Sequence, residues 1–163
     1  MIVVVACGNR NRSDDGVGAE VLRLLAESGG GADPAGVKLL DAGTDGLAVM
    51  FAARGAQGLI VVDACLSGSE PGALFEVPAE VLACPRAPSF STHDFRWEDA
   101  LAAGRAILKD EFPKDITVFL IEAANTALGL ALSAPVAEAA RTAARRIDLM
   151  LRARLREGAI LAM

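Results

Sequence analysis

Carboxylates stand at or just beyond the ends of several apolar runs in this sequence. Asp14 and Asp15 lie in "CGNRNRSDDGVG", which follows "MIVVVA", while Asp41 ends "VKLLD" and Asp63 ends "GLIVVD". If the runs are parallel strands of an open sheet, their carboxyl ends share one edge, where such sheets bind ligands. The pattern therefore predicts that these acids gather in one cleft. The alternatives are structural: Asp14 or Asp15 caps a helix that begins near Gly16, and Asp41 and Asp63 satisfy turn amides.

His93 is the only histidine of the chain, and it lies in "STHDF" between a proline-containing loop and a predicted helix. One imidazole with two carboxylates is a ligand set that suits a divalent transition metal and leaves coordination positions open. Without a metal, the same groups suit general acid–base chemistry. A single loop histidine commonly has no chemical role, so these residue types alone do not define a reaction.

The elements that would position these residues alternate between strand and helix patterns. Nearly continuous apolar runs rich in β-branched residues predict strands buried on both faces. These runs are residues 2–6, 37–42, 59–64 and 116–122, with a shorter edge strand at 73–78. Helical patterns cover residues 16–28, 46–54 and 95–108, and Ser133 is placed to cap a long C-terminal helix. This alternation predicts a three-layer α/β domain.

Helical spacing also predicts which side chains each helix buries. The inner faces are expected to carry Val17, Val21, Leu24 and Leu25 in the first helix, Leu47, Met50 and Phe51 in the second, Phe95, Ala102, Ile107 and Leu108 in the third, and Val136, Ala140, Ile147, Leu151 and Leu155 in the last. The arginines of the last helix are expected on its outer side.

Composition narrows the class of protein. With 163 residues, the chain is expected to form a single domain over 1–163, and 53% hydrophobic residues supply a large aliphatic core. A formal net charge of -5 argues against a nucleic-acid partner. The 3 cysteines form no CxxC pair, and no run suits a signal core or a membrane span, so we expect a cytoplasmic protein with no membrane partner. The first loop lacks the spacing of a dinucleotide fingerprint, and we expect no organic cofactor.

Five stretches of the chain carry further local patterns around these residues. They are "GNRNRSDDGVG" (8–18), "DAGTDGLAVM" (41–50), "IVVDACLSGSEPGAL" (60–74), "STHDF" (91–95) and "IEAANTALGLALSAPV" (121–136). In this order, they resemble the landmarks of the hydrogenase maturation endopeptidases, from the first strand into the last helix. The resemblance implies a twisted, mostly parallel five-stranded sheet with helices on both faces.

The resemblance also implies an activity and a site. The family removes the C-terminal extension of the large-subunit precursor of a nickel–iron hydrogenase after nickel is inserted, so that precursor is the expected partner of a monomer. The family's metal-binding and catalytic positions fall on Asp15, Asp63 and His93, with the nickel supplied by the precursor. Three residues depart from the family's pattern: Asp15 stands where glutamate is frequent, Asp45 where an apolar residue is usual, and Ala123 where proline is common.

Two other functions remain open from the sequence. Cys65 or Cys7 could act as a nucleophile with His93 as its base, which would make the protein a thiol hydrolase. A non-catalytic chaperone that senses nickel in the precursor would use the same three ligands without cutting the chain.

Overall fold

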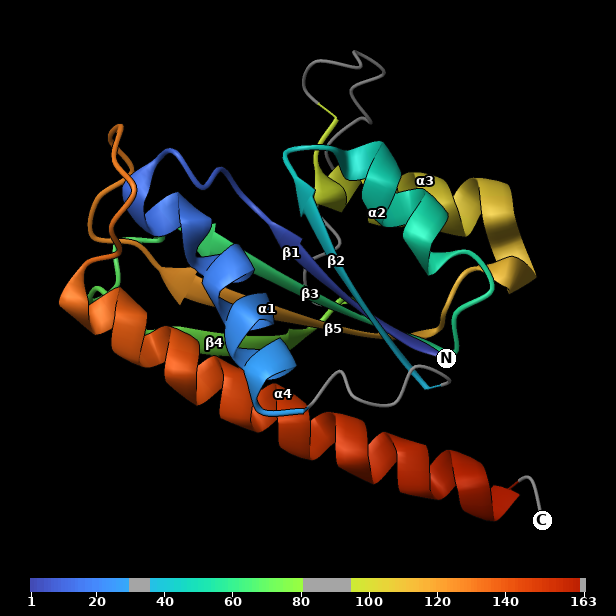
Figure 1. Ribbon diagram of the computed structural model, residues 1–163. Helices are drawn as coiled ribbons and strands as arrows, with labels where there is room; N and C mark the ends of the chain where they lie inside the picture. Colours follow the sequence, from blue (N-terminus) through green and yellow to red (C-terminus); the bar gives the residue numbers. More distant parts are fainter. Residues whose placement is uncertain (30–35, 81–94, 162–163) are drawn as a thin grey trace.

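A computed structural model of the protein describes residues 1–29, 36–80 and 95–161. At its centre is a twisted five-stranded sheet with the order β2-β1-β3-β5-β4 (Figure 1). The strands are β1 (Ile2–Cys7), β2 (Val37–Gly43), β3 (Gly58–Cys65), β4 (Leu74–Pro78) and β5 (Asp115–Glu122). All five predicted strands are confirmed, and each end lies within one residue of its predicted position.

The sheet is parallel except at one edge. β1 pairs in parallel with β2 and β3, and β3 with β5, whereas β4 runs antiparallel to β5. Every residue of β1 is buried, because helices cover both faces of the sheet and leave no side of a central strand for polar groups. β4 alternates between exposed and half-buried residues and ends at Pro78, as expected of an edge strand. The carboxyl ends of the four parallel strands therefore meet at one edge of the molecule.

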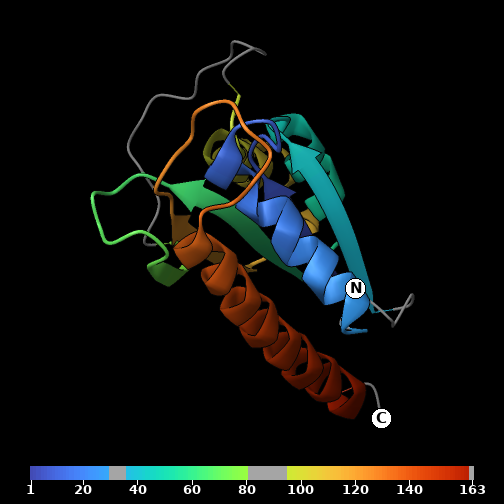
Figure 2. The same cartoon turned by 60° about the vertical axis from the view of Figure 1, so that its left-hand side comes forward.

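The helices form two outer layers. α1 (Val17–Glu27) and α4 (Ala134–Leu161) pack on one face of the sheet, and α2 (Gly46–Ala53) and α3 (Trp97–Leu108) pack on the other (Figures 1 and 2). Each face has its own apolar cluster, so the core has two halves separated by the sheet. This arrangement confirms the three-layer α/β prediction. Two short 3-10 helices, η1 (Ser13–Gly16) and η2 (Lys109–Glu111), complete the described elements.

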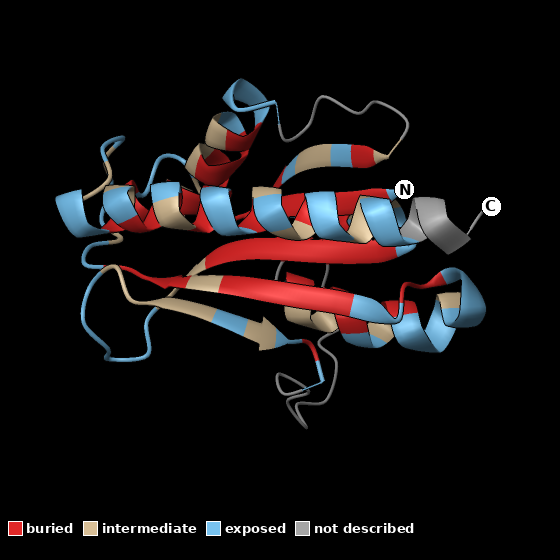
Figure 3. Ribbon diagram, turned by 90° about the horizontal axis from the view of Figure 1, so that it is seen from below, coloured by how far each residue is buried: buried red, intermediate tan, exposed pale blue. Residues whose placement is uncertain are grey.

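The predicted inner faces are correct for two helices and wrong for the other two. The predicted face of α1 is correct, and Figure 3 shows that the outer side of α4 is exposed while its inner side is buried, with Val136, Ala140, Ile147 and Leu151 in the core. In α2, however, Phe51 is 61% exposed and Val49 is buried instead. In α3, Ile107 is 66% exposed, and the helix buries Trp97, Ala100, Leu101 and Gly104.

The reason lies in the composition of these helices. α2 reads "GLAVMFAA", which has no polar residue to mark an outer side, so spacing alone cannot select its buried face. α3 begins at Trp97 rather than at Phe95, because Arg96 occupies the N-cap position and Asp99 accepts a hydrogen bond from its backbone N–H. None of the described helices combines the length and the apolar character needed to cross a membrane.

Candidate functional site

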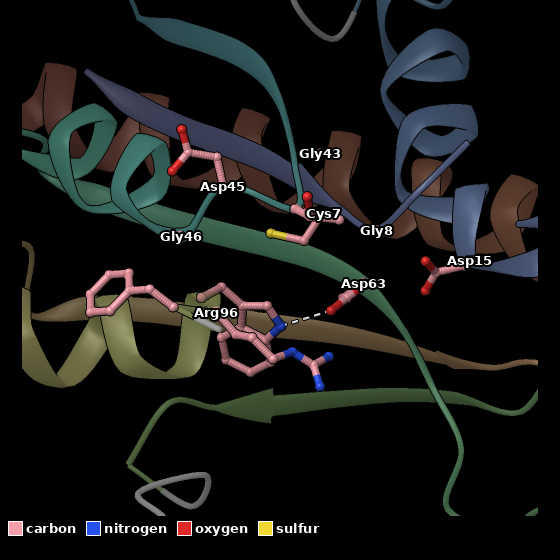
Figure 4. A pocket seen from close by; sticks show the side chains of 11 residues that line it. Cys7, Gly8, Asp15, Gly43, Asp45, Gly46, Asp63 and Arg96 are labelled. Carbon is pink, nitrogen blue, oxygen red and sulfur yellow. Dashed lines mark hydrogen bonds between the residues drawn. The ribbon is translucent and has the colours of Figure 1, made fainter. Parts of the chain in front are cut away.

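Two neighbouring cavities open at the carboxyl edge of the sheet. The larger, of about 540 Å³, extends toward the start of α2, and the other, of about 450 Å³, extends along the end of β3. Four residues line both cavities: Asp15, Asp63, Arg96 and Trp97. The two cavities are therefore parts of one cleft that runs past both predicted carboxylates. Figure 4 shows the larger part, with Asp15 extending from η1 toward Asp63 at the end of β3.

Asp63 is held at this position by the alternation of β3. Side chains two residues apart share a sheet face, so Asp63 lies on the same side as Leu59 and Val61, facing α3. The residue is only 4% exposed. Its Oδ1 accepts the Ala64 N–H at 2.8 Å, and its Oδ2 accepts the indole N–H of Trp97 at 2.8 Å (Figure 4). Asp63 is thus a buried acid with a fixed orientation.

The environment of Asp63 opposes its ionisation. Burial raises the pKa of Asp63 from 3.8 to about 6, and the charge of Asp15 acts in the same direction. The hydrogen bonds from Trp97 and Ala64, and the charge of Arg96, act in the opposite direction without cancelling the effect of burial. Arg96 is the only cationic residue among the described residues that line the cleft. A carboxyl group with this pKa is suited to accept a proton near neutral pH or to bind a cation.

Asp15 reaches the cleft from the other side. It is half-buried in η1, and its Oδ2 accepts the Asn9 N–H at 2.8 Å. Gly8 makes this close approach possible, because its φ of +107° disfavours other residues and a Cβ there would lie 2.0 Å from the Asp15 carbonyl oxygen. The same Cβ would lie 3.3 Å from Asp63 Oδ1. The backbone of one glycine therefore brings the two acids, 48 positions apart in the chain, to the same place.

Asp14 has a different role from its neighbour. It is completely buried, and it accepts hydrogen bonds from the backbone of Ala124, Asn125 and Ser133 and from the Ser133 hydroxyl. Burial alone would raise its pKa, but the hydrogen bonds outweigh burial and the pKa of Asp14 is lowered. Asp14 therefore caps no residue of α1. It ties η1 to the segment that leads into α4, and the Ser133 hydroxyl donates to Asp14 instead of capping α4.

The predicted metal site is partly within the described structure. Asp15 and Asp63 line the same cleft, whereas His93 lies outside the described residues, so the three-residue ligand set stays a prediction. Within residues 1–29, 36–80 and 95–161, no group of three or more histidine, cysteine, aspartate or glutamate residues is placed to hold a metal ion. The carboxylate pair is compatible with a cation, since each Asp63 oxygen accepts one hydrogen bond and retains a further lone pair.

The two described cysteines are poor candidates for a nucleophile. Cys7 lines the cleft but is buried, and burial together with the charge of Asp63 raises its pKa. Burial and the hydrogen bond to Glu122 raise the pKa of Cys65 to about 12. Because the thiolate is the reactive form, both environments oppose thiol chemistry. The thiol-hydrolase alternative gains no support from the geometry.

Other singled-out acids hold local structure. Glu122 accepts hydrogen bonds from the backbone and hydroxyl of Ser67, from Gly68 and from the Cys65 thiol, and the Ser67 bonds chiefly lower its pKa to about 2. Asp45 caps α2 by accepting the Ala48 N–H. Asp41 accepts the Gly43 N–H and pairs with Arg10, which confirms its predicted turn role.

The departure at Ala123 has a structural consequence. The Ala123 N–H donates to the Cys65 carbonyl at 2.9 Å and so joins the end of β5 to the end of β3. Proline at this position would lack that donor.

Of the four residues that line both parts of the cleft, Arg96 and Trp97 were not predicted from sequence. Trp97 carries a signal, since it is the only tryptophan of the chain and its N–H needs a partner when buried.

Comparison with known proteins identifies the relationship. The chain is 34% identical over 105 residues to the hydrogenase expression/formation protein HupD of Rhodobacter capsulatus. The aligned region covers 64% of this chain and 49% of that protein. It is 31% identical over 125 residues to HupM of Azotobacter chroococcum mcd 1, covering 76% of this chain and 58% of that protein. The chain thus spans about half the length of the curated relatives it matches.

Solved structures show the same fold. The hydrogenase maturating endopeptidase HybD from E. coli matches with a TM-score of 0.71 at 23% identity, over 96% of this chain and 93% of that chain. The nickel–iron hydrogenase maturation protease HycI from Thermococcus kodakarensis matches with a TM-score of 0.72 at 22% identity, over 93% and 92%.

A family model gives the assignment. The model described as HycI, hydrogenase maturation protease, matches residues 20–148, a range that includes Asp63 and His93 and begins after Asp15. Together with the identity to HupD and HupM, this match settles which family the sequence motifs resembled. The chain belongs to the hydrogenase maturation protease family.

Proposed function

We propose that this protein is an endopeptidase that removes the C-terminal extension of a nickel–iron hydrogenase large-subunit precursor after nickel insertion. The observation that carries the proposal is the meeting of Asp15 and Asp63 in one cleft at the carboxyl edge of the sheet. Family membership supplies the reaction class, and the cleft supplies a place for it. The free thiols of Cys7 and Cys65 suit the reducing environment of the cytoplasm, where we place the reaction.

In this proposal, the nickel belongs to the substrate. Asp15 and Asp63, with His93 as the predicted third ligand, bind the nickel that the precursor already carries. Only a loaded precursor gains this binding energy, so the two acids distinguish it from an empty one. The cation also relieves the cost of ionising Asp63 in its buried position beside Asp15. Bound in this way, nickel would polarise the scissile carbonyl or activate a water molecule.

The test compares nickel-loaded and metal-free precursor as substrates. Each is incubated with the protein, and the intact masses are followed with time. We expect only the loaded precursor to lose its C-terminal segment. Asp63→Asn and Asp15→Asn should slow the cleavage about 100-fold or more, because loss of a cation ligand removes several kcal/mol of stabilisation at the reacting bond.

Asp41→Asn is the matched control, since Asp41 also lies near the carboxyl end of a parallel strand but is exposed and pairs with Arg10. It should cleave at the wild-type rate. A precursor that forms a stable nickel-dependent complex and keeps its mass would show the non-catalytic chaperone instead. Equal cleavage of loaded and empty precursor would refute the role of nickel.

A further inference from the structure

Trp97 lies between the core and the cleft. The residue is only 5% exposed, yet it lines both parts of the cleft together with Asp15 and Asp63. Its indole N–H donates to Asp63 Oδ2 at 2.8 Å, within a buried environment (Figure 4). The other oxygen of Asp63 accepts the Ala64 N–H at 2.8 Å. With one donor on each oxygen, rotation of the carboxylate would break both bonds, so its plane is fixed.

The indole itself is rigidly placed. Trp97 is the first residue of α3, and the helix start is held by two hydrogen bonds of the Arg96 backbone, whose N–H donates to Asp99 Oδ2 at 3.3 Å and whose carbonyl accepts the Ala100 N–H at 3.0 Å. The segment before it is clamped from α2, because the Gly46 N–H donates to the Phe95 carbonyl at 3.2 Å. A Cβ at Gly46 would lie 2.4 Å from that carbonyl oxygen, so the two backbones are in direct contact. The position of the N–H is thus set by two packed helices rather than by a free loop.

We propose that Trp97 is a positioning residue, whose indole N–H holds the Asp63 carboxylate so that its remaining lone pairs are available to a divalent cation in the cleft. Groups that hydrogen-bond a metal ligand fix its orientation, and their loss typically costs 10–100-fold in metal affinity. Trp97 plays this part for Asp63 through one hydrogen bond. Any effect of Trp97 on cleavage of the precursor rests on the proposed function, but its effect on metal affinity does not.

The alternative is that Trp97 only fills the core and happens to satisfy its N–H. The two roles differ in what the N–H contributes. A packing role depends on the shape of the ring, whereas a positioning role depends on the donor. Because Trp97 is the only tryptophan of the chain, an analogue supplied to a tryptophan auxotroph replaces this residue alone. Benzothienylalanine has the shape of the indole with sulfur in place of the N–H.

The experiment measures Ni²⁺ affinity by titration calorimetry and stability by urea unfolding for four proteins. They are the wild type, the analogue-containing protein, Trp97→Phe and Leu101→Ala. Leu101 is buried on α3 in the same apolar cluster as Trp97, and its side chain can form no hydrogen bond. Leu101→Ala therefore controls for loosened packing. We expect the analogue, which keeps the ring but loses the donor, to bind Ni²⁺ about 10-fold more weakly while losing less stability than Leu101→Ala, and Trp97→Phe to show the same loss of affinity. Leu101→Ala should lose stability and keep the wild-type affinity.

The outcomes separate this inference from the proposed function. Equal Ni²⁺ affinity of the wild type and the analogue, or no uptake of Ni²⁺ by the wild type, would overturn the positioning role. If the wild type cleaves the precursor while the analogue binds Ni²⁺ normally, the proposed function stands and this inference fails. If affinity falls as expected but the precursor stays intact, the inference stands and the endopeptidase proposal fails.

Discussion

Replacing Asp14 by alanine tests how the first loop is anchored. Asp14 is 0% exposed and accepts four hydrogen bonds, from the backbone of Ala124, Asn125 and Ser133 and from the Ser133 hydroxyl. Asp14→Ala removes the acceptor and leaves these donors without their partner. The partners lie 110 to 119 positions away in the chain, so the loss detaches η1 from the start of α4.

The expected cost follows from the number and kind of bonds lost. A buried donor left without its acceptor costs about 1–3 kcal/mol, so the loss of several such bonds to one carboxylate costs several kcal/mol. Ala124 and Asn125 are exposed, so water can replace the acceptor of their N–H groups, and the total cost is smaller than the sum over all four lost hydrogen bonds. We therefore expect Asp14→Ala to lower the free energy of unfolding by ~3–5 kcal/mol, a large part of the 5–15 kcal/mol typical of a domain.

The effect should depend on pH in a defined direction. Because the folded state lowers the pKa of Asp14 below 3.8, the stabilisation is complete above that value and is lost as pH falls through the folded-state pKa. The difference between wild type and Asp14→Ala should accordingly shrink in acid. Asp41→Ala is the control, because its bonds to Gly43 and Arg10 are exposed and worth less than about 1 kcal/mol.

Urea unfolding followed by far-UV circular dichroism, at neutral pH and at a series of acidic pH values, measures these quantities. Fluorescence of Trp97 supplies a second probe from the opposite layer of the fold. A loss below 1 kcal/mol, or a loss equal to that of Asp41→Ala, would show that the four hydrogen bonds do not anchor η1.

Three further predictions concern the cleft. Gly8→Ala should lower the free energy of unfolding by more than about 2 kcal/mol in a urea melt, because the added Cβ would overlap the Asp15 carbonyl. Gly55→Ala is the control: Gly55 also has a positive φ of +73°, but no atom lies within 4 Å of its added Cβ, so the cost should be only about 1 kcal/mol. Cys65→Ser should cleave the precursor at an unchanged rate, and loss of cleavage in a folded variant would restore the thiol mechanism. In the metal-free protein, the carboxyl of Asp63 should titrate near pH 6 by NMR, and titration near 4 would contradict the effect of burial. Because the folded state binds this proton more tightly than the unfolded state does, the free energy of unfolding should fall by ~3 kcal/mol as pH rises from about 4 to 6.

The strands were predictable from sequence because burial on both faces leaves a local trace. β1 is a continuous apolar run, and β3 is apolar as far as Asp63, near its carboxyl end. The faces of α2 and α3 were not predictable, because their many small and apolar residues permit several inner sides. Phe51 and Ile107 are exposed although their types suggested the core. Which side of such a helix is buried depends on the partner layer, which the local sequence does not contain.

The site was predictable only in part for a related reason. Strand ends in a parallel sheet meet at one edge, so topology alone brought Asp63 toward the first loop. The partners of each acid could not be predicted in this way. Trp97 lies 34 positions from Asp63, and no local pattern pairs them. The resemblance to the family selected Asp15 rather than Asp14, and the structure shows that Asp15 is the one that lines the cleft.

Three buried acids have two different roles here, and the number of hydrogen-bond donors that each receives explains the difference. Asp14 and Glu122 each accept hydrogen bonds from four donor groups, and both have a lowered pKa, as suits acids that hold loops together. Within the described residues, Asp63 accepts only two, and its pKa is raised although it is as deeply buried. A buried acid whose charge is incompletely compensated, and which lies beside a second acid, leaves an electrostatic cost in the folded protein. A cation in the cleft would remove that cost. Under the proposed function, the shortage of donors that destabilises Asp63 in the metal-free protein would therefore favour binding of a loaded precursor.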